Sequence, residues 1–144
     1  MEYILKNIPA YQSASNELNQ VSKQWQNEVE KLGKEAKSLY DSYQASVKTL
    51  SDAQKTKKEE EIVAKEKSAA ELRRKYFGPE GELFKKREAL MQPIQDEIYE
   101  AVKAISTQKG YAVVVDRASA SSIIFASPNI DISNEVLAKL GYSN

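Results

Sequence analysis

The side chains that most often carry catalysis or hold metals are scarce in this sequence. It contains no Cys and no His, which excludes thiol chemistry, His-based triads and the usual Cys/His zinc sites. The remaining candidates are carboxylates, which gather at Glu59–Glu61 and at Asp96, Glu97 and Glu100. Each group lies in a charged helical stretch that implies no pocket around it, so solvated helix surface is the better interpretation.

The motifs that mark phosphate or acyl chemistry are also missing from the sequence. We find no phosphate-binding loop, no nucleophile elbow and no Walker pattern. The Asp116-Arg117 pair follows a strand-like run and predicts a turn or an ion pair rather than a site. We therefore predict that the protein is not an enzyme. We expect no catalytic, cofactor-binding or metal-binding residues and no cofactor.

Composition indicates a folded chain with much surface. The 144 residues are normally one domain. Hydrophobic residues reach 41% although the mean hydropathy is −0.60, which favours a thin fold over a globule or a disordered chain. Lys+Arg and Asp+Glu are equal at 21 each, so no global field predicts binding to nucleic acid or supports contact with an anionic membrane surface.

A regular apolar spacing runs through the first third of the chain. The positions are Tyr11, Ala14, Leu18, Val21, Trp25, Val29, Leu32, Ala36, Leu39, Tyr43, Val47 and Leu50. Steps of three and four residues give a period of roughly 3.5, which is the spacing of a coiled-coil seam. The pattern predicts one long helix that packs against another helix along this seam.

The end of the seam predicts a helical hairpin. Ser51-Asp52 are good N-cap residues, so we place a reversal near residues 49–53 and a second helix after it. This helix is dominated by charge over 55–75 and has a predicted break near 77–82, where Gly78 and Pro79 occur. Gly110 ends it as a glycine just past the last helical turn.

A last helix is predicted over 134–140, with Ser133 as its N-cap and Gly141 after its end. Two strand-like runs precede it, over 111–116 and 122–126. Their apolar residues form the predicted oligomerisation core, which consists of Val113, Val114, Val115, Ile123, Ile124 and Phe125. Two short strands are marginal alone. We therefore expect them to pair with strands of another protomer or to close into a small barrel.

The order of these segments resembles the Skp (OmpH-like) family of periplasmic chaperones. The resemblance is carried by the opening Met1-Glu2-Tyr3-Ile4-Leu5, the two-helix hairpin, GYAVVVD at 110–116, IIFA at 123–126 and DIS at 131–133. It implies a single domain that is mainly α with a small β body. A long antiparallel helical hairpin, or coiled-coil arm, at about 10–109 would project from a β-barrel-like trimerisation body built from about 1–9 and 110–144.

The same resemblance implies a function. Three arms of a homotrimer would surround a cavity that holds unfolded outer-membrane proteins and prevents their aggregation without ATP. The expected location is the periplasm, with a signal peptide and a first strand preceding Met1 in the precursor. Candidate client-facing aromatic residues are Tyr40, Tyr43, Tyr76 and Phe77, although most aromatic residues at helical spacing belong to a seam.

Two other function classes fit parts of the pattern. A structural coiled-coil adaptor or scaffold protein would use the same hairpin to bind one dedicated folded partner. A prefoldin-like chaperone would place its strands between the two helices. Here the helices are contiguous and the strand-like runs lie at the chain end, which argues against that third class.

Overall fold

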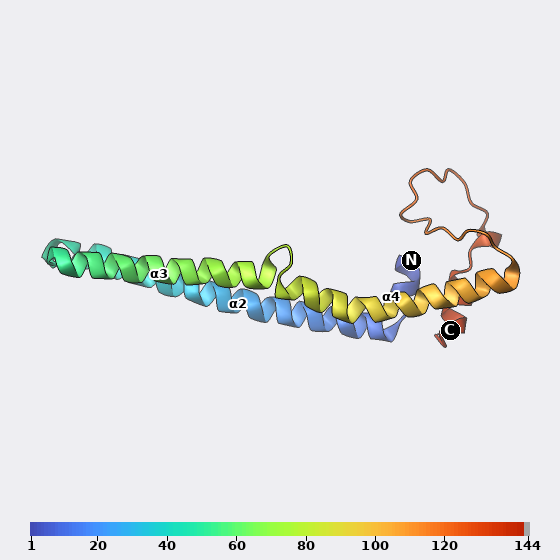
Figure 1. Ribbon diagram of the computed structural model, residues 1–144, viewed down its shortest axis with the longest axis horizontal. Coiled ribbons are helices and arrows are strands. Elements are labelled where there is room, and N and C mark those ends of the chain that lie inside the picture. Colours follow the sequence, from blue (N-terminus) through green and yellow to red (C-terminus); the bar gives the residue numbers. More distant parts are fainter. Residues whose placement is uncertain (143–144) are drawn as a thin grey trace. The chain divides into compact units, whose positions relative to one another are not determined.

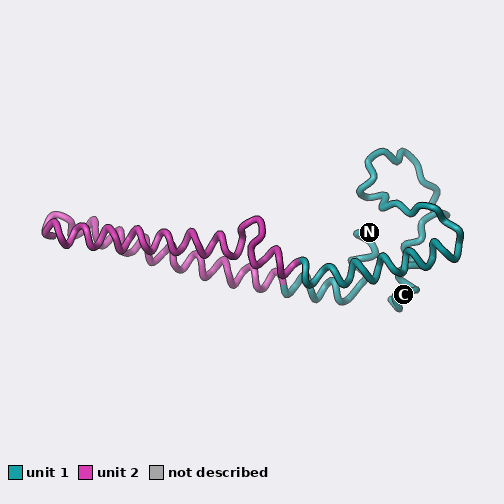
Figure 2. The backbone as a smooth tube through the Cα atoms, viewed as in Figure 1, with its two compact units in different colours: residues 1–17, 88–144 teal, residues 18–87 magenta. Residues whose placement is uncertain are grey.

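The computed structural model describes residues 1–142, which are mostly helical (Figure 1). Its elements are α1 (Glu2–Lys6), α2 (Pro9–Ser46), η1 (Val47–Thr49), α3 (Asp52–Phe77), α4 (Glu82–Lys109), η2 (Pro128–Ile130) and α5 (Ser133–Lys139), where η marks a short 3-10 helix. The chain divides into unit 1, residues 1–17 and 88–144, and unit 2, residues 18–87 (Figure 2). None of the described helices is both long and apolar enough to cross a bilayer.

The predicted seam of α2 is confirmed. Every seam position from Tyr11 to Leu50 is buried or half-buried, and most positions between them are exposed. In unit 2, α2 lies antiparallel beside α3 (Figure 1), and three cross-helix contacts fix the register. They join Trp25 to Tyr76, Glu35 to Lys65 and Tyr43 to Glu59. The residue numbers of each pair add up to nearly the same value, as an antiparallel pair requires.

The partner seam on α3 is harder to see in the sequence. Its buried and half-buried positions are Lys55, Lys58, Ile62, Lys65, Ala69, Leu72 and Tyr76, which again follow steps of three and four. Three of these seven positions are lysines, whose aliphatic stems can cover apolar surface while the ammonium stays in water. Val63, by contrast, is 61% exposed. The seam of α3 is therefore less apolar toward the hairpin turn than near Tyr76.

The hairpin turn is closed by a capping box. The Ser51 hydroxyl accepts from the Gln54 N–H at 3.3 Å, and the Gln54 side chain accepts from the Ser51 N–H at 3.0 Å. This confirms Ser51 as the N-cap of α3. The Ser51 and Gln54 side chains together satisfy two of the backbone donors that a helix start leaves free. The reversal itself occupies η1 and the two residues after it.

Residues 78–81 form a tight loop between α3 and α4. This loop arches away from α2 (Figure 1). Gly78 ends α3, and a Cβ atom there would lie 2.4 Å from the Arg74 carbonyl oxygen. At Gly81 a Cβ atom would lie 2.8 Å from the carbonyl oxygens of both Lys75 and Tyr76. All of these neighbours are backbone atoms, which cannot swing aside. The loop therefore requires glycine at both positions because of close backbone approach.

Two glycine substitutions in unit 2 should change stability in opposite directions. Gly81→Ala forces the loop backbone apart, so we expect it to lower the free energy of unfolding by about 1–3 kcal/mol. Gly33→Ala lies in the middle of α2 with nothing within 4 Å of the new methyl group. It should raise the free energy of unfolding by about 0.5–1 kcal/mol. Urea unfolding followed by circular dichroism would measure both, and a neutral Gly81→Ala would show that the loop can relax.

The core of unit 1 joins both ends of the chain to α4. Ile8, Ile98 and Val136 are its most completely buried side chains. The remaining buried members are Ile4, Ala14, Ile94, Ala101, Ile105 and Leu137. Two polar contacts hold α5 in place, since the Tyr3 hydroxyl donates to the Asn134 amide oxygen at 2.9 Å and Lys109 pairs with Glu135 at 2.6 Å.

The predicted strands are wrong for the described chain. No residue of 1–142 is in a strand, residues 2–6 form helix α1, and the β-barrel-like body is absent. The run from 111 to 127 is instead an exposed, irregular loop, in which Val113 is 75%, Phe125 81% and Ile124 99% exposed. The physical reason is that strands need partners for their backbone N–H and C=O groups, and this single chain offers none beside the loop.

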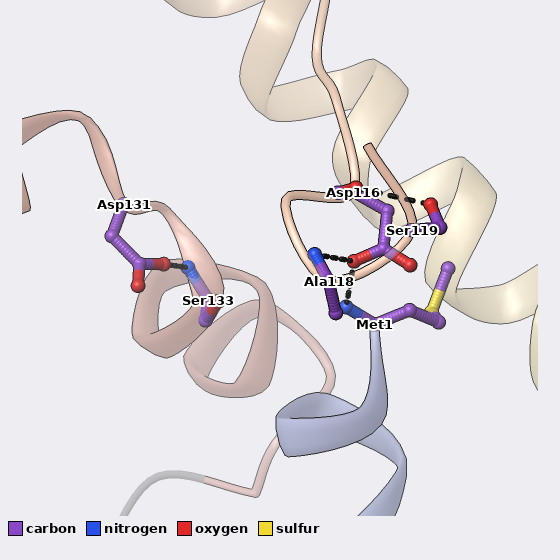
Figure 3. Close-up of polar contacts among 6 residues, drawn as sticks. All are labelled: Met1, Asp116, Ala118, Ser119, Asp131 and Ser133. Atoms are coloured by element: carbon purple, nitrogen blue, oxygen red, sulfur yellow. Dashed lines mark hydrogen bonds and ion pairs between the residues drawn. The ribbon is translucent and has the colours of Figure 1, made fainter. Parts of the chain in front are cut away.

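A turn at Asp116 interrupts this loop, as the sequence predicted (Figure 3). One carboxylate oxygen of Asp116 accepts from the N-terminal ammonium of Met1 at 2.9 Å and from the Ala118 N–H at 3.2 Å. The Ser119 hydroxyl donates to the Asp116 carbonyl oxygen at 3.0 Å. The bond from the ammonium group is the main cause that lowers the pKa of Asp116. The prediction of a turn or an ion pair at Asp116 is confirmed, since both are present.

The start of α5 differs slightly from its predicted position. We expected Ser133 to be the N-cap, but it is the first helical residue. Its N–H donates to a carboxylate oxygen of Asp131 at 2.9 Å (Figure 3). Bonds from Ser133 lower the pKa of Asp131. Asp131 thus supplies the acceptor that a helix start needs, and Gly141, with φ of 85°, follows the end of α5 as predicted.

Candidate functional site

Tyr76 and Phe77 are held in a small aromatic cluster at the end of α3. The Tyr76 ring stacks on the Trp25 ring of α2 with centroids 4.6 Å apart and an interplanar angle of 5°. Its hydroxyl donates to a carboxylate oxygen of Glu28 at 2.6 Å. That hydrogen bond is the main cause that raises the pKa of Tyr76. Tyr76 is therefore half-buried and fixed from two sides.

Phe77 is the exposed member of this cluster. Its ring meets the Tyr76 ring edge-on, with centroids 6.3 Å apart and an interplanar angle of 81°. It remains 38% exposed. Edge-on packing is a preferred arrangement of aromatic pairs. One part of the Phe77 ring is thus held by Tyr76 while another part remains open to a ligand.

The two tyrosines predicted on α2 lie in different environments. Tyr40 is 48% exposed on the helix surface. Tyr43 is only 8% exposed, and its hydroxyl donates to Glu59 of α3, which is the main cause that raises the pKa of Tyr43. In this conformation Tyr43 joins the two helices. Contact of Tyr43 with a client stays a prediction, and it would require α2 and α3 to separate there.

Unit 2 also contains a shallow groove between α2 and α3. Its volume is about 700 Å³ and it is open to solvent. The apolar side chains that line it are Val29, Ala70 and Phe77, and the charged ones are Glu30, Arg73 and Arg74. The backbone at Gly78 also lines the groove. Of the four predicted client-facing residues, Phe77 alone lines this groove.

Sequence reasoning missed most of this groove. Arg73 and Phe77 are four residues apart on α3 and so share one helix face, which was a readable signal in the segment RRKYFG. The contribution of Val29 and Glu30 was not readable, because it depends on the register between α2 and α3. The aromatic stack was missed for the same reason, although Trp25 had been placed on the seam.

The predicted oligomerisation core lies entirely in the loop of unit 1. Val113, Val114, Val115, Ile124 and Phe125 are exposed large hydrophobic side chains, as is Ile123 at 37%. Single apolar residues on a surface are ordinary, but this many in one short segment is not. Their role in association stays a prediction.

Carboxylate clusters form no metal site in the described part of the chain. No group of three or more Asp and Glu side chains in residues 1–142 is arranged to hold an ion. Three carboxylates accept a bond from a side chain of the facing helix: Glu28 and Glu35 of α2 accept from α3, and Glu59 of α3 accepts from α2. They therefore act as links between the two helices.

The exposed aromatic side chains of the hairpin and the exposed apolar loop are surfaces on which another protein could be bound. Comparison with protein families identifies the kind of protein. The family model described as outer membrane protein (OmpH-like) matches residues 1–140, and the chain belongs to this family. Its members are periplasmic chaperones of outer-membrane proteins. A search of curated proteins gives no match.

Proposed function

We propose that this protein is an ATP-independent holdase of the periplasm. It binds unfolded outer-membrane proteins and keeps them from aggregating until they are released. The observation that carries the proposal is the family match over residues 1–140. The hairpin of α2 and α3 supports it, because Tyr40, Phe77 and Val63 leave apolar surface exposed along helices that are otherwise charged.

The surface chemistry of the hairpin suits reversible binding. A holdase needs contacts that are numerous, weak and replaceable, since it releases its client without fuel. Each exposed aromatic side chain can bury part of its area against a client, and the surrounding lysines and glutamates keep the empty protein soluble. A neutral net charge means that salt should weaken client binding only modestly.

The exposed loop supports assembly into a homotrimer. Burying a Val, Ile or Phe side chain contributes about 1.5–3 kcal/mol, so the six side chains of the predicted core offer a large driving force when copies meet. Strand pairing between copies would also satisfy the backbone groups of 111–126 that a single chain leaves to solvent. We propose that this loop becomes the body of the trimer and that the hairpins form the cavity around the client.

The proposal is tested by diluting a denatured outer-membrane β-barrel protein from urea into buffer with or without this protein. We expect stoichiometric protein, without nucleotide, to keep the client soluble, as measured by light scattering. Three unrelated barrel clients and one soluble globular protein are compared. Protection of all three barrels supports a holdase. Protection of none, with tight binding of one folded protein instead, would favour a structural adaptor or scaffold and would overturn the proposal.

A further inference from the structure

The groove between α2 and α3 combines apolar surface with positive charge. Its floor is apolar, with Val29 buried at 8% exposure and Phe77 open at 38%. Beside this floor stand two guanidinium groups, those of Arg73 and Arg74. Neither forms an ion pair with any other residue that the structure describes. An apolar floor beside two unpaired cations is complementary to an apolar side chain that has a carboxylate as its neighbour.

The negative charge already in the groove does not cancel this positive charge. Glu30 lines the groove and accepts a bond from the Gln26 amide at 3.3 Å. Two guanidinium groups against one carboxylate leave a net positive charge at the site. Arg is suited to this role, because its planar fork can bind a carboxylate through two parallel hydrogen bonds and can also lie on an aromatic face.

The Phe77 ring is already held in position before a ligand binds in the groove. Tyr76 is fixed by its stack on Trp25 and by its bond to Glu28, and it holds one edge of Phe77. Phe77 therefore loses little freedom when a ligand arrives, which lowers the entropic cost of binding. An incoming aromatic side chain can meet the Phe77 ring in the offset or edge-on geometry that aromatic pairs prefer.

We propose that this groove is an anchor site for an extended client segment in which an aromatic side chain is next to an acidic residue. The inference rests on the proposed holdase function and adds a preferred sequence class to it. Strands of outer-membrane barrels alternate lipid-facing apolar with lumen-facing polar side chains and carry aromatic residues at both ends of the apolar band. Unfolded strands of this kind therefore supply aromatic residues with polar or acidic neighbours.

The test uses a capped five-residue peptide, Thr-Phe-Asp-Thr-Gly, titrated into the full-length protein. Trp25 is the only tryptophan of the chain. It stacks on Tyr76, and Tyr76 in turn contacts Phe77. The fluorescence of Trp25 should therefore change when a peptide binds in the groove. Calorimetry provides a second measurement that does not depend on this relay. We expect saturable binding, and roughly tenfold weaker binding when Asp is replaced by Asn or Phe by Ala in the peptide.

Protein variants locate the binding. Arg73→Gln combined with Arg74→Gln should weaken the peptide by roughly tenfold. The matched control, Lys34→Gln combined with Lys57→Gln, removes the same charge from exposed helix positions outside the groove and should bind normally. Phe77→Ala should weaken binding as well, whereas Phe84→Ala, an exposed aromatic residue outside the groove, should not. If Phe77→Ala disturbs the helices, comparison of the double arginine variant with the double lysine control still tests whether the peptide binds in the groove.

The outcomes separate this inference from the proposed function. Suppression of aggregation by the wild-type protein, together with equal affinity for the Asp and Asn peptides, would overturn the anchor site and leave the holdase intact. Failure to suppress aggregation, with specific peptide binding that the arginine variant loses, would overturn the holdase and leave the groove as a binding site. A change in oligomer mass on Arg73→Gln and Arg74→Gln would assign the groove to contacts between copies and would also overturn the inference.

Discussion

Replacing Ile124 with aspartate should convert the proposed trimer into monomers. The side chain is 99% exposed in the single chain, so the substitution costs nothing in an isolated subunit. In the proposed trimer the same position lies in an apolar body, where an unpaired carboxylate costs several kcal/mol in each of three copies. Light scattering after size exclusion should therefore give a mass near 16.2 kDa for the variant and about three times that value for the wild type.

A matched control keeps this prediction specific. Val63→Asp introduces the same charge at a position of α3 that is 61% exposed and far in sequence from the loop, and this variant should remain trimeric. Phe125→Asp, at a residue that is 81% exposed, should behave like Ile124→Asp. A wild-type monomer, or a trimer that survives both loop substitutions, would show that the 111–127 loop is not the association surface.

Shortening the hairpin should abolish protection of clients without dissociating the trimer. Residues 32–45 and 56–69 can be removed together, which takes two heptads from each helix and keeps the hairpin turn. The antiparallel register set by the Trp25–Tyr76 stack is preserved by this design, because equal lengths are removed from both helices. The seam also keeps its phase, since a heptad is the repeat of the packing.

The shortened protein retains both the association loop and the groove. It lacks Tyr40 and Tyr43, and its hairpins enclose a smaller volume. We therefore expect trimer mass and peptide binding to survive while a denatured barrel protein aggregates at the same rate as without chaperone. Protection equal to that of the full-length protein would show that the outer part of the hairpin does not hold the client, and the adaptor interpretation would then gain support.

The sequence predicted the helical part of the fold well because helix packing leaves a local, periodic signal. The seam from Tyr11 to Leu50 repeats every three and four residues, and each of its positions is buried or half-buried. Local stop and start signals were equally informative. Ser51 caps α3, and Gly110 follows α4 with φ of 71°, because caps and left-handed turns depend on only a few neighbouring residues.

The chain end was predicted less well, because strands depend on partners rather than on their own residues. The runs at 113–115 and 123–125 have the β-branched and aromatic composition of strands, and that composition led to a predicted β body. In one chain these residues have no neighbour to complete a ladder, so they form an exposed loop. Such a composition favours strands only where partner strands are present to pair with them.

By itself the sequence determined that α2 has one apolar face, that the chain reverses after it, and that no Cys or His chemistry exists. Only the tertiary structure decided which face of α3 meets α2, since Lys55, Lys58 and Lys65 hold seam positions and hide the pattern from hydropathy. It also decided that Trp25 stacks on Tyr76 and that Val29 lines the same groove as Arg73 and Phe77. The physical reason is that helical periodicity is encoded locally, whereas the register between two helices is set by the turn and by contacts between residues far apart in sequence.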